Sequence, residues 1–306
     1  AKSGITSFTG GSYLESIGDN CFVNCASLES VTLGGKLMLI GENAFVNCTE
    51  LTQIAIPDSV KNVGKKAFYG NTALSSVKMS DNVIFIPDEC FSGCTALETF
   101  TWNPETKLIG RLAFSNCTKL ANFDFVNLEK LYDNSFLGSG VTVAQLGEGV
   151  DESVSKLEEI ETQSFKGCEN LATVGIGGNV ETIKTQAFAD CTNLETAVIA
   201  DSVTEIAPDA FDGCDNLTIY CSEGSYAYLY AQSQGIPVST FVVEAIPNQT
   251  YTGSKIEPEV KVSLSGNSLE ANTDFGVTYA NNINVGEADV NVKGKGDFRM
   301  FASKAN

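Results

Sequence analysis

The sequence contains no histidine. Without histidine there is no imidazole to act as a general base or to complete a zinc site. The sequence also lacks G-x-S-x-G, P-loop and zinc-binding motifs. Carboxylates alone leave a glycosidase open, but they occupy variable, solvent-type positions and do not converge on a cleft. We therefore expect a protein that is not an enzyme and that has no catalytic residues, no metal and no cofactor.

Basic residues are scarce: 19 Lys and Arg stand against 38 Asp and Glu, which gives a net charge of −19. Such a charge repels phosphate backbones and anionic lipids, so it argues against binding nucleic acid or a membrane surface. Acidic solubility is the ordinary explanation. Weak calcium binding by surface carboxylates stays open, although no D-x-[DN]-x-[DN]-G loop is present.

Long apolar runs are also missing. No stretch is long and apolar enough to span a membrane, and the chain does not open on a charged and apolar leader. We expect no membrane insertion of this fragment. A trimmed beginning is suggested by Ile5 and Phe8, which precede Leu28 and Val31 by one full period of the repeat described next and so resemble the end of an earlier rung.

What the sequence has instead is a repeat marked by phenylalanine. Nine phenylalanines follow one another at intervals of 23 residues, apart from one interval of 22 and one of 29: Phe22, Phe45, Phe68, Phe91, Phe114, Phe136, Phe165, Phe188 and Phe211. A constant period in the twenties is typical of leucine-rich repeats, whose rungs bury their apolar faces only against one another. The sequence therefore predicts a mixed α/β solenoid whose function depends on an extended surface.

Other positions keep the same register, so that one rung reads roughly I-G-x-x-A-F-x-x-C-x-x-L-x-x-V-x-I. The L-x-x-V-x-I part alternates with period two, which predicts a short strand in each rung and a parallel sheet along one face. The Phe136 rung departs from the pattern, with Thr142 in the leucine position. The valine position is filled by Val31, Ile54, Val77, Phe100, Phe123, Val174, Ala197 and Tyr220.

The A-F-x-x-C part places a small residue, the phenylalanine and a thiol within one turn. We expect a short helical or 3₁₀ segment there, with the phenylalanine rings stacked into a spine. Burial of each ring stabilises the fold by roughly 1.5–3 kcal/mol.

Cysteine follows the repeat, because seven thiols stand three residues after a repeat phenylalanine: Cys25, Cys48, Cys94, Cys117, Cys168, Cys191 and Cys214. Asn71 and Ser139 replace cysteine in two rungs, so no rung needs a sulfur partner. A disulfide framework and a metal site are the functional alternatives, whereas free cysteine also serves as a small hydrophobe. Single thiols per rung without histidine do not match zinc spacing. We expect the thiols to be reduced.

The 29-residue interval after Phe136 indicates an insertion. The segment from Val141 to Glu159 carries glycines and then four carboxylates, which are Asp151, Glu152, Glu158 and Glu159. We expect an acidic loop that projects from the solenoid, and we name these four residues as candidate binding residues. Insertions in repeat proteins often lie on a binding face, but a tolerated surface insertion is the alternative.

Outward positions of the predicted strands form the other candidate surface, since solenoids usually bind partners on the concave sheet. These positions are small and polar, without a basic stripe or aromatic platforms: Ser30, Thr32, Gln53, Ala55, Ser76, Lys78, Thr99, Thr101, Asn122, Asp124, Thr173, Gly175, Thr196 and Val198. Trp102 shares its position with Leu33 and Ile56, which predicts a core residue.

After Leu217 the period changes. Tyr226, Leu229 and Tyr230 have helical spacing, Ser222 or Ser225 can cap the helix, and Gly235 and Pro237 can end it. We expect a helix near 222–235 that closes the solenoid. From 240 onward, alternating apolar residues and turn signals predict a small β-sandwich. The predicted domains are a repeat array (residues 1–240) and a C-terminal module (residues 241–306).

The repeat, as in I-G-E-N-A-F-V-N-C-T-E-L-T-Q-I-A-I-P-D-S-V at 40–60, resembles the BspA-like leucine-rich repeats of bacterial surface proteins. The resemblance covers 5–221. The C-terminal module resembles the immunoglobulin-like modules that accompany such arrays, through Y-T-G-S-K-I-E-P-E-V at 251–260, L-E-A-N-T-D-F-G-V-T-Y-A-N-N-I-N-V-G-E-A at 269–288 and G-K-G-D-F at 294–298. Because it ends before another apolar strand, we expect the module to be truncated.

The resemblance implies an extracellular, cell-surface or cell-wall-associated protein, with adhesion to host or matrix proteins or glycans as the activity of some members. It brings no catalytic residues. Reduced thiols in such a place conflict with the usual compartment rule, and an anaerobic habitat would remove the conflict. Two hypotheses remain: a non-catalytic interaction protein that binds a host or extracellular-matrix protein or glycan, and a structural spacer that presents other domains.

Overall fold

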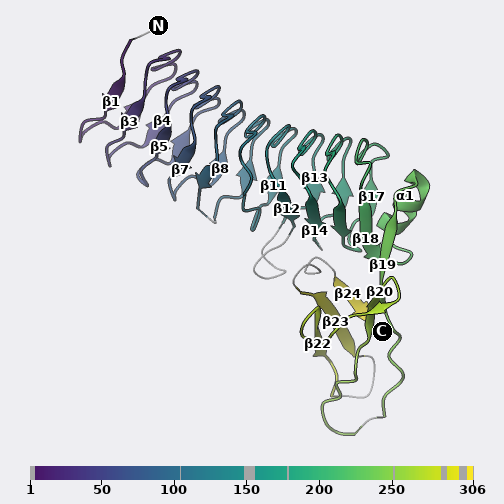
Figure 1. Cartoon of the computed structure of the whole chain (residues 1–306). Coiled ribbons are helices and arrows are strands. Elements are labelled where there is room, and N and C mark those ends of the chain that lie inside the picture. Colours follow the sequence, from purple (N-terminus) through teal and green to yellow (C-terminus); the bar gives the residue numbers. More distant parts are fainter. Residues whose placement is uncertain are drawn as a thin grey trace.

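The structure is a computed structural model that describes residues 4–103, 105–147, 156–177, 179–250, 252–283, 288–295 and the backbone of 302–305. The chain forms an elongated solenoid of stacked rungs, with a small β-structure beside its C-terminal end (Figure 1). This arrangement confirms the solenoid that the phenylalanine period predicts.

Nearly every rung contributes one longer strand to a row of parallel strands along one side of the coil, which we call the main sheet; residues 122–124 occupy the same place without forming a strand. Its neighbours pair one period apart, for example Ile54 with Val77 and Val174 with Ala197. The earliest pair joins Phe8 to Val31, which confirms that the first residues are in phase with the repeat. The strands are β1 (Ser7–Thr9), β3 (Ser30–Thr32), β5 (Gln53–Ala55), β7 (Ser76–Lys78), β9 (Thr99–Thr101), β12 (Val143–Leu146), β14 (Thr173–Ile176), β16 (Thr196–Ile199) and β18 (Thr218–Ser222).

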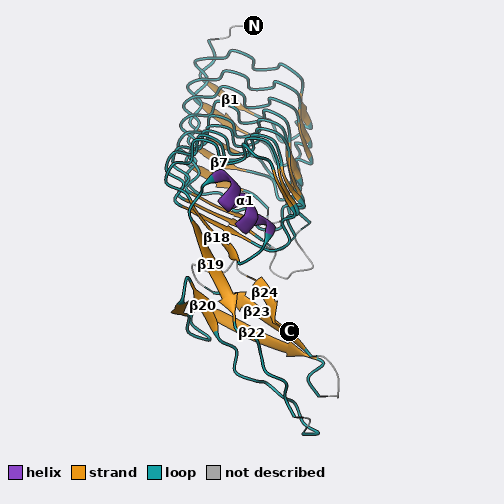
Figure 2. Ribbon diagram, turned by 90° about the vertical axis from the view of Figure 1, so that its right-hand side faces the viewer, coloured by secondary structure: helices purple, strands orange, loops and turns teal. Residues whose placement is uncertain are grey.

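A second row of two-residue strands, the side strands, ends on the aliphatic residue five positions before each phenylalanine. Figure 2 shows the two rows on different sides of the coil. In each side strand the second residue is buried and the first faces outward. The side strands are β2 (Ser16–Ile17), β4 (Leu39–Ile40), β6 (Asn62–Val63), β8 (Phe85–Ile86), β10 (Leu108–Ile109), β11 (Lys130–Leu131), β13 (Glu159–Ile160), β15 (Thr182–Ile183) and β17 (Glu205–Ile206).

The repeat phenylalanines form a continuous spine inside the coil. Phe91 is 0% exposed, and its ring lies parallel to those of Phe68 and Phe114, at centroid distances of 5.4 and 5.6 Å. The same stacking extends from Phe22 to Phe211. Offset stacked rings are a favoured aromatic geometry, so the spine links each rung to both neighbours.

The prediction of a short helical segment around each phenylalanine is wrong, because the described residues there form successive turns and no helix. The cause is backbone conformation: the residue two positions after the phenylalanine has a positive φ in every described rung, as in Asn24 (58°), Asn47 (56°) and Gly70 (71°). A left-handed residue interrupts an α-helix. The amides instead bond to the next rung, as Phe45 N–H does to Ala67 O at 2.7 Å.

The ladder cysteines have a bonding role besides filling a small buried position. Cys117 Sγ donates to the Phe91 carbonyl of the preceding rung at 3.1 Å, and Cys94 Sγ donates to the Phe68 carbonyl at 3.2 Å. Four more rungs repeat this contact. A buried carbonyl near a tight turn thereby gains a donor. All ten cysteines are free in the structure.

Two rungs are one residue shorter than expected, which corrects two assignments. In the Phe136 rung the leucine position is filled by Val141, which is 0% exposed, and Thr142 follows it. In the last rung Ile219 pairs with Ala197 and Tyr220 pairs with Val198, so Ile219 points inward and Tyr220 outward. The one-residue shift reverses the faces because strand side chains alternate.

Helix α1 (Tyr226–Gln234) follows the last rung, within the predicted range. Ser225 caps it by accepting from Tyr228 N–H, and Gly235 ends it with a φ of 70°. Its buried face consists of Ala227, Tyr230 and Ala231, whereas Tyr226 and Leu229 are exposed, contrary to the predicted apolar spacing. The Tyr230 ring lies 6.2 Å from Phe211, so α1 covers the end of the spine.

The C-terminal strands continue the main sheet. β19 (Val238–Val243) pairs parallel to β18, and β20 (Val262–Leu264) and β21 (Asn267–Ser268) follow antiparallel. A second antiparallel sheet contains β22 (Phe275–Ala280), β23 (Asp289–Gly294) and β24 (Ala302–Ala305). These two sheets make a small β-structure of the predicted kind. Because β19 crosses residue 240, the array and the C-terminal module share one sheet.

Candidate functional surface

The outer face of the main sheet is open to solvent over its N-terminal half. Thr32, Gln53, Lys78, Thr101 and Asp124 are all exposed, as predicted from strand alternation. The side chains are hydroxyls, amides and single charges at a spacing set by the rungs. This half offers an extended, flat, polar surface with many hydrogen-bonding groups.

The C-terminal half of the same face is covered, which corrects the prediction of exposed positions there. Val198 is 4% exposed and Gly175 is buried. Val198 and Tyr220 pack with Phe241 and Phe275 in a second hydrophobic core, which the C-terminal module builds against the sheet. Sequence alternation identified the outward direction of Val198 but could not identify the neighbour that covers it.

The insertion lies between β12 and β13. Asp151 and Glu152 lie outside the described residues. Glu158 is exposed, and its carbonyl accepts the amides of Glu181 and Thr182 in the next rung. The acidic loop and its role in binding therefore remain predictions, and the structure places only the residues at its base.

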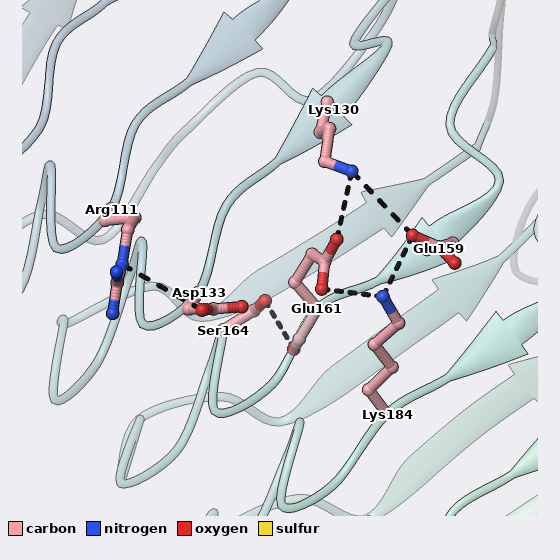
Figure 3. A network of polar contacts seen from close by, with 7 residues as sticks. All are labelled: Arg111, Lys130, Asp133, Glu159, Glu161, Ser164 and Lys184. Carbon is pink, nitrogen blue, oxygen red and sulfur yellow. Dashed lines mark hydrogen bonds and ion pairs between the residues drawn. The ribbon is translucent and has the colours of Figure 1, made fainter.

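Glu159, the fourth predicted residue, belongs to an ion-pair network on the side strands (Figure 3). Lys184 Nζ lies 2.9 Å from Glu159 Oε2 and 2.9 Å from Glu161 Oε2, and Lys130 Nζ lies 3.1 Å from Glu161 Oε1. The sequence analysis did not single out Glu161, whose side chain is 10% exposed. Lysines one rung before and one rung after these glutamates were the signal that could have identified the network.

The network also determines protonation. Burial acts to raise the pKa of Glu161, but hydrogen bonds from Lys184 and Lys130 outweigh it, so the pKa lies below its usual value. The hydrogen bond to Glu161 raises the pKa of Lys130. Glu161, Lys130 and Lys184 are therefore all charged at neutral pH. Glu159 forms an ion pair with Lys184 and is not free to bind a partner.

Nine of the ten thiols are buried. Burial raises the pKa of Cys48 and of Cys94 to about 12, so neither is a thiolate at neutral pH. Among the described residues, no group of three or more Cys, Asp or Glu side chains is arranged to hold a metal ion. Over the same part of the chain, no helix has the length and apolar character needed to cross a bilayer.

The repeat has a matching family model, described as the BspA type leucine-rich-repeat region, with six copies over residues 15–142 and 152–233. This match covers more than half of the chain. The chain belongs to the BspA-type leucine-rich-repeat family. The stacked turns, the phenylalanine spine and the left-handed turn positions are thus the form that the BspA-type repeat takes here.

Solved structures with similar repeats come from several bacteria. A leucine-rich repeat protein of T. pallidum is 23% identical, with a TM-score of 0.42, and the match covers 62% of this chain and 78% of that one. A leucine-rich cell surface protein of Faecalibacterium prausnitzii is 25% identical, with a TM-score of 0.42 and coverage of 75% and 63%. The pneumococcal vaccine antigen PcpA is 16% identical, with a TM-score of 0.37 and coverage of 76% and 78%. No curated protein sequence matches the chain significantly.

Proposed function

We propose that this BspA-type chain is a non-catalytic interaction protein of the bacterial cell surface, which adheres to a host or extracellular-matrix protein or glycan through its repeat array. The observation that carries the proposal is the open N-terminal half of the main-sheet face. Solenoids commonly use such extended faces to bind partners. The family resemblance supports an extracellular or cell-wall location.

The chemistry of that face favours a polar partner. Outward hydroxyls and amides, such as those of Thr99, Thr101 and Gln53, suit hydrogen bonds to glycan hydroxyls or to a polar protein surface. We propose that the C-terminal module is an immunoglobulin-like domain. It covers the C-terminal half of the main-sheet face. Its position leaves one side of the array free.

Binding is tested best with the full chain. A fragment that ends at residue 240 divides β19 and uncovers Val198 and Tyr220. We therefore propose biolayer interferometry of the full chain against matrix glycoproteins, mucins and polysaccharides. Saturable binding that weakens at least about tenfold in Thr101→Arg supports adhesion through the face, since a long charged side chain blocks close contact.

A matched control adds the same charge elsewhere. Thr72 is exposed in the turn segment of the Phe68 rung, so Thr72→Arg should leave binding unchanged. Reversal of Asp151, Glu152 and Glu158 in one variant tests the predicted acidic loop. Absence of binding to every member of the panel by the folded parent would favour the alternative function, a spacer that presents other domains at the cell surface.

A further inference from the structure

The side strands carry an exposed apolar cluster in the N-terminal half of the array, which we call the side patch. It consists of Met38, Leu39, Ile84 and Phe85, which are 48%, 41%, 58% and 38% exposed. These residues belong to two rungs: Leu39 and Phe85 begin β4 and β8, and Met38 and Ile84 directly precede them (Figure 1). Most equivalent positions in other rungs are polar, as in Lys61 with Asn62. Exposed apolar groups that cluster indicate an interaction surface.

The residues in and around the side patch are arranged almost symmetrically about the Lys61 rung. Over five successive rungs the outer row reads Glu15, Met38, Lys61, Ile84 and Lys107. The inner row reads Ser16, Leu39, Asn62, Phe85 and Leu108, and side strands of neighbouring rungs pair in this register where they are joined. The apolar pairs Met38–Leu39 and Ile84–Phe85 lie on the two sides of the Lys61 rung. Beyond these pairs lie Glu15 at one end and Lys107 at the other.

We propose that the side patch binds a second copy of this chain in an antiparallel, two-fold symmetric dimer. A two-fold contact brings the same surface of both copies together, so each residue must suit its symmetry mate. With the axis along β6, Met38 faces Ile84 and Leu39 faces Phe85 of the other copy. The Asn62 amides face each other and can exchange hydrogen bonds.

Charge complementarity selects a second copy over a partner of another kind. In the antiparallel register Glu15 of each copy faces Lys107 of the other, and this pair occurs twice. Glu15 is exposed and the Lys107 side chain is 41% exposed, although Lys107 also contacts Glu129 at 2.8 Å. The Lys61 pair on the axis opposes association, which limits the affinity.

The fold leaves room for this arrangement. The C-terminal module lies below β18, at the other end of the solenoid from β4 (Figure 1). In the antiparallel register the rungs beyond Lys107 extend past the first rung of the other copy, so the modules do not meet. Five rungs at about 4.8 Å make a face roughly 20 Å long, which is small for a specific interface. We therefore expect a dissociation constant on the order of 10 µM.

Sedimentation velocity of the full chain over a range of concentrations tests the dimer. We expect Phe85→Glu to raise the dissociation constant at least about tenfold, because it places charge in the apolar contact. Tyr69→Glu is the matched control, since Tyr69 is 36% exposed and lies in a turn segment away from the side strands. Unchanged thermal unfolding of both variants confirms that they fold.

A charge exchange tests the register. Glu15→Lys and Lys107→Glu should each weaken the dimer, and the double variant should restore it, because each copy then again presents opposite charges. Lys61→Met should strengthen it by removing the like-charge pair.

Three results would overturn the proposal. A parent that stays monomeric at about 200 µM excludes a dimer of relevant affinity. A dimer that Phe85→Glu leaves unchanged uses another surface, and failure of the double variant to restore association contradicts the antiparallel register. Loss of binding to a panel ligand in Phe85→Glu, with a monomeric parent, would assign the side patch to that ligand.

Discussion

Replacing Phe91 with alanine tests whether the stacked rings couple the rungs. Phe91 is 0% exposed, stacks on Phe68 and Phe114, and meets Phe100 edge-on at 5.2 Å. Truncation of a buried phenylalanine costs about 3–5 kcal/mol, of which each lost ring pair accounts for roughly 0.5–1.5 kcal/mol. Because neighbours enclose the ring from both sides, the cavity cannot collapse freely. We expect a loss of about 4–5 kcal/mol in the free energy of unfolding.

Phe22→Ala is the matched control, at the end of the stack. Phe22 is 7% exposed, and its outer neighbour Phe8 is only half-buried, with its ring tilted by 57°. Fewer enclosing contacts let the site relax, so we expect a smaller loss of about 3 kcal/mol or less. The comparison isolates the effect of having a stacked neighbour on both sides.

Urea unfolding measures both variants. The single tryptophan, Trp102, reports locally because its ring lies 4.6 Å from Phe123 and 6.2 Å from Phe100, and circular dichroism reports the whole chain. In a solenoid each rung contacts only its neighbours. Phe91→Ala should therefore also make the unfolding transition reported by Trp102 differ from the one reported by circular dichroism. Equal unfolding free energies for the two variants, or a Phe91→Ala variant as stable as the parent, would refute the coupling.

Two further predictions concern titratable groups. Cys21 alone among the ten cysteines is exposed, so the native chain should react with about one equivalent of a thiol reagent and the unfolded chain with all its thiols; rapid labelling of several native thiols would contradict the burial of the ladder. The lowered pKa of Glu161 means that its ion pairs stabilise the fold above the unfolded pKa of about 4.3 and are lost as pH falls through the folded pKa. The melting temperature of Glu161→Gln should therefore lie below that of the parent at pH 7 and approach it toward about pH 3, and a constant difference would argue against the network.

Much of the array could be predicted from the sequence, because the phenylalanine motif occurs nine times and each rung repeats a similar local environment. The main-sheet strands, the buried phenylalanines and helix α1 follow from patterns of apolar residues and caps. The turn segments were missed, although the signal was present. Asn24, Asn47, Gly70 and Gly93 stand two residues after the phenylalanine, and asparagine and glycine are the residues that most readily adopt a left-handed conformation.

The candidate surfaces were less predictable. Alternation identified the outward residues of the main sheet, but whether they stay open depends on where a distant segment packs. Val198 shows the difference, because it is outward in its strand and buried under Phe241 and Phe275. The side patch was missed because a two-residue strand has too little alternation to be recognised. Glu159 was taken for a free carboxylate, whereas its lysine partners lie in other rungs.

The sequence by itself determined the repeat, its period, the residues of the core and the family, since these depend on contacts that recur at a constant separation along the chain. Only the tertiary structure decided which faces are open, how the C-terminal module joins the main sheet, and which charges pair. The joining of β19 to β18 occurs once and has no counterpart in the repeat, whereas Glu161 and Lys184 keep the period of the repeat but belong to an ion-pair network that involves residues of three rungs. A pattern within one chain segment carries no information about a neighbour that occurs once.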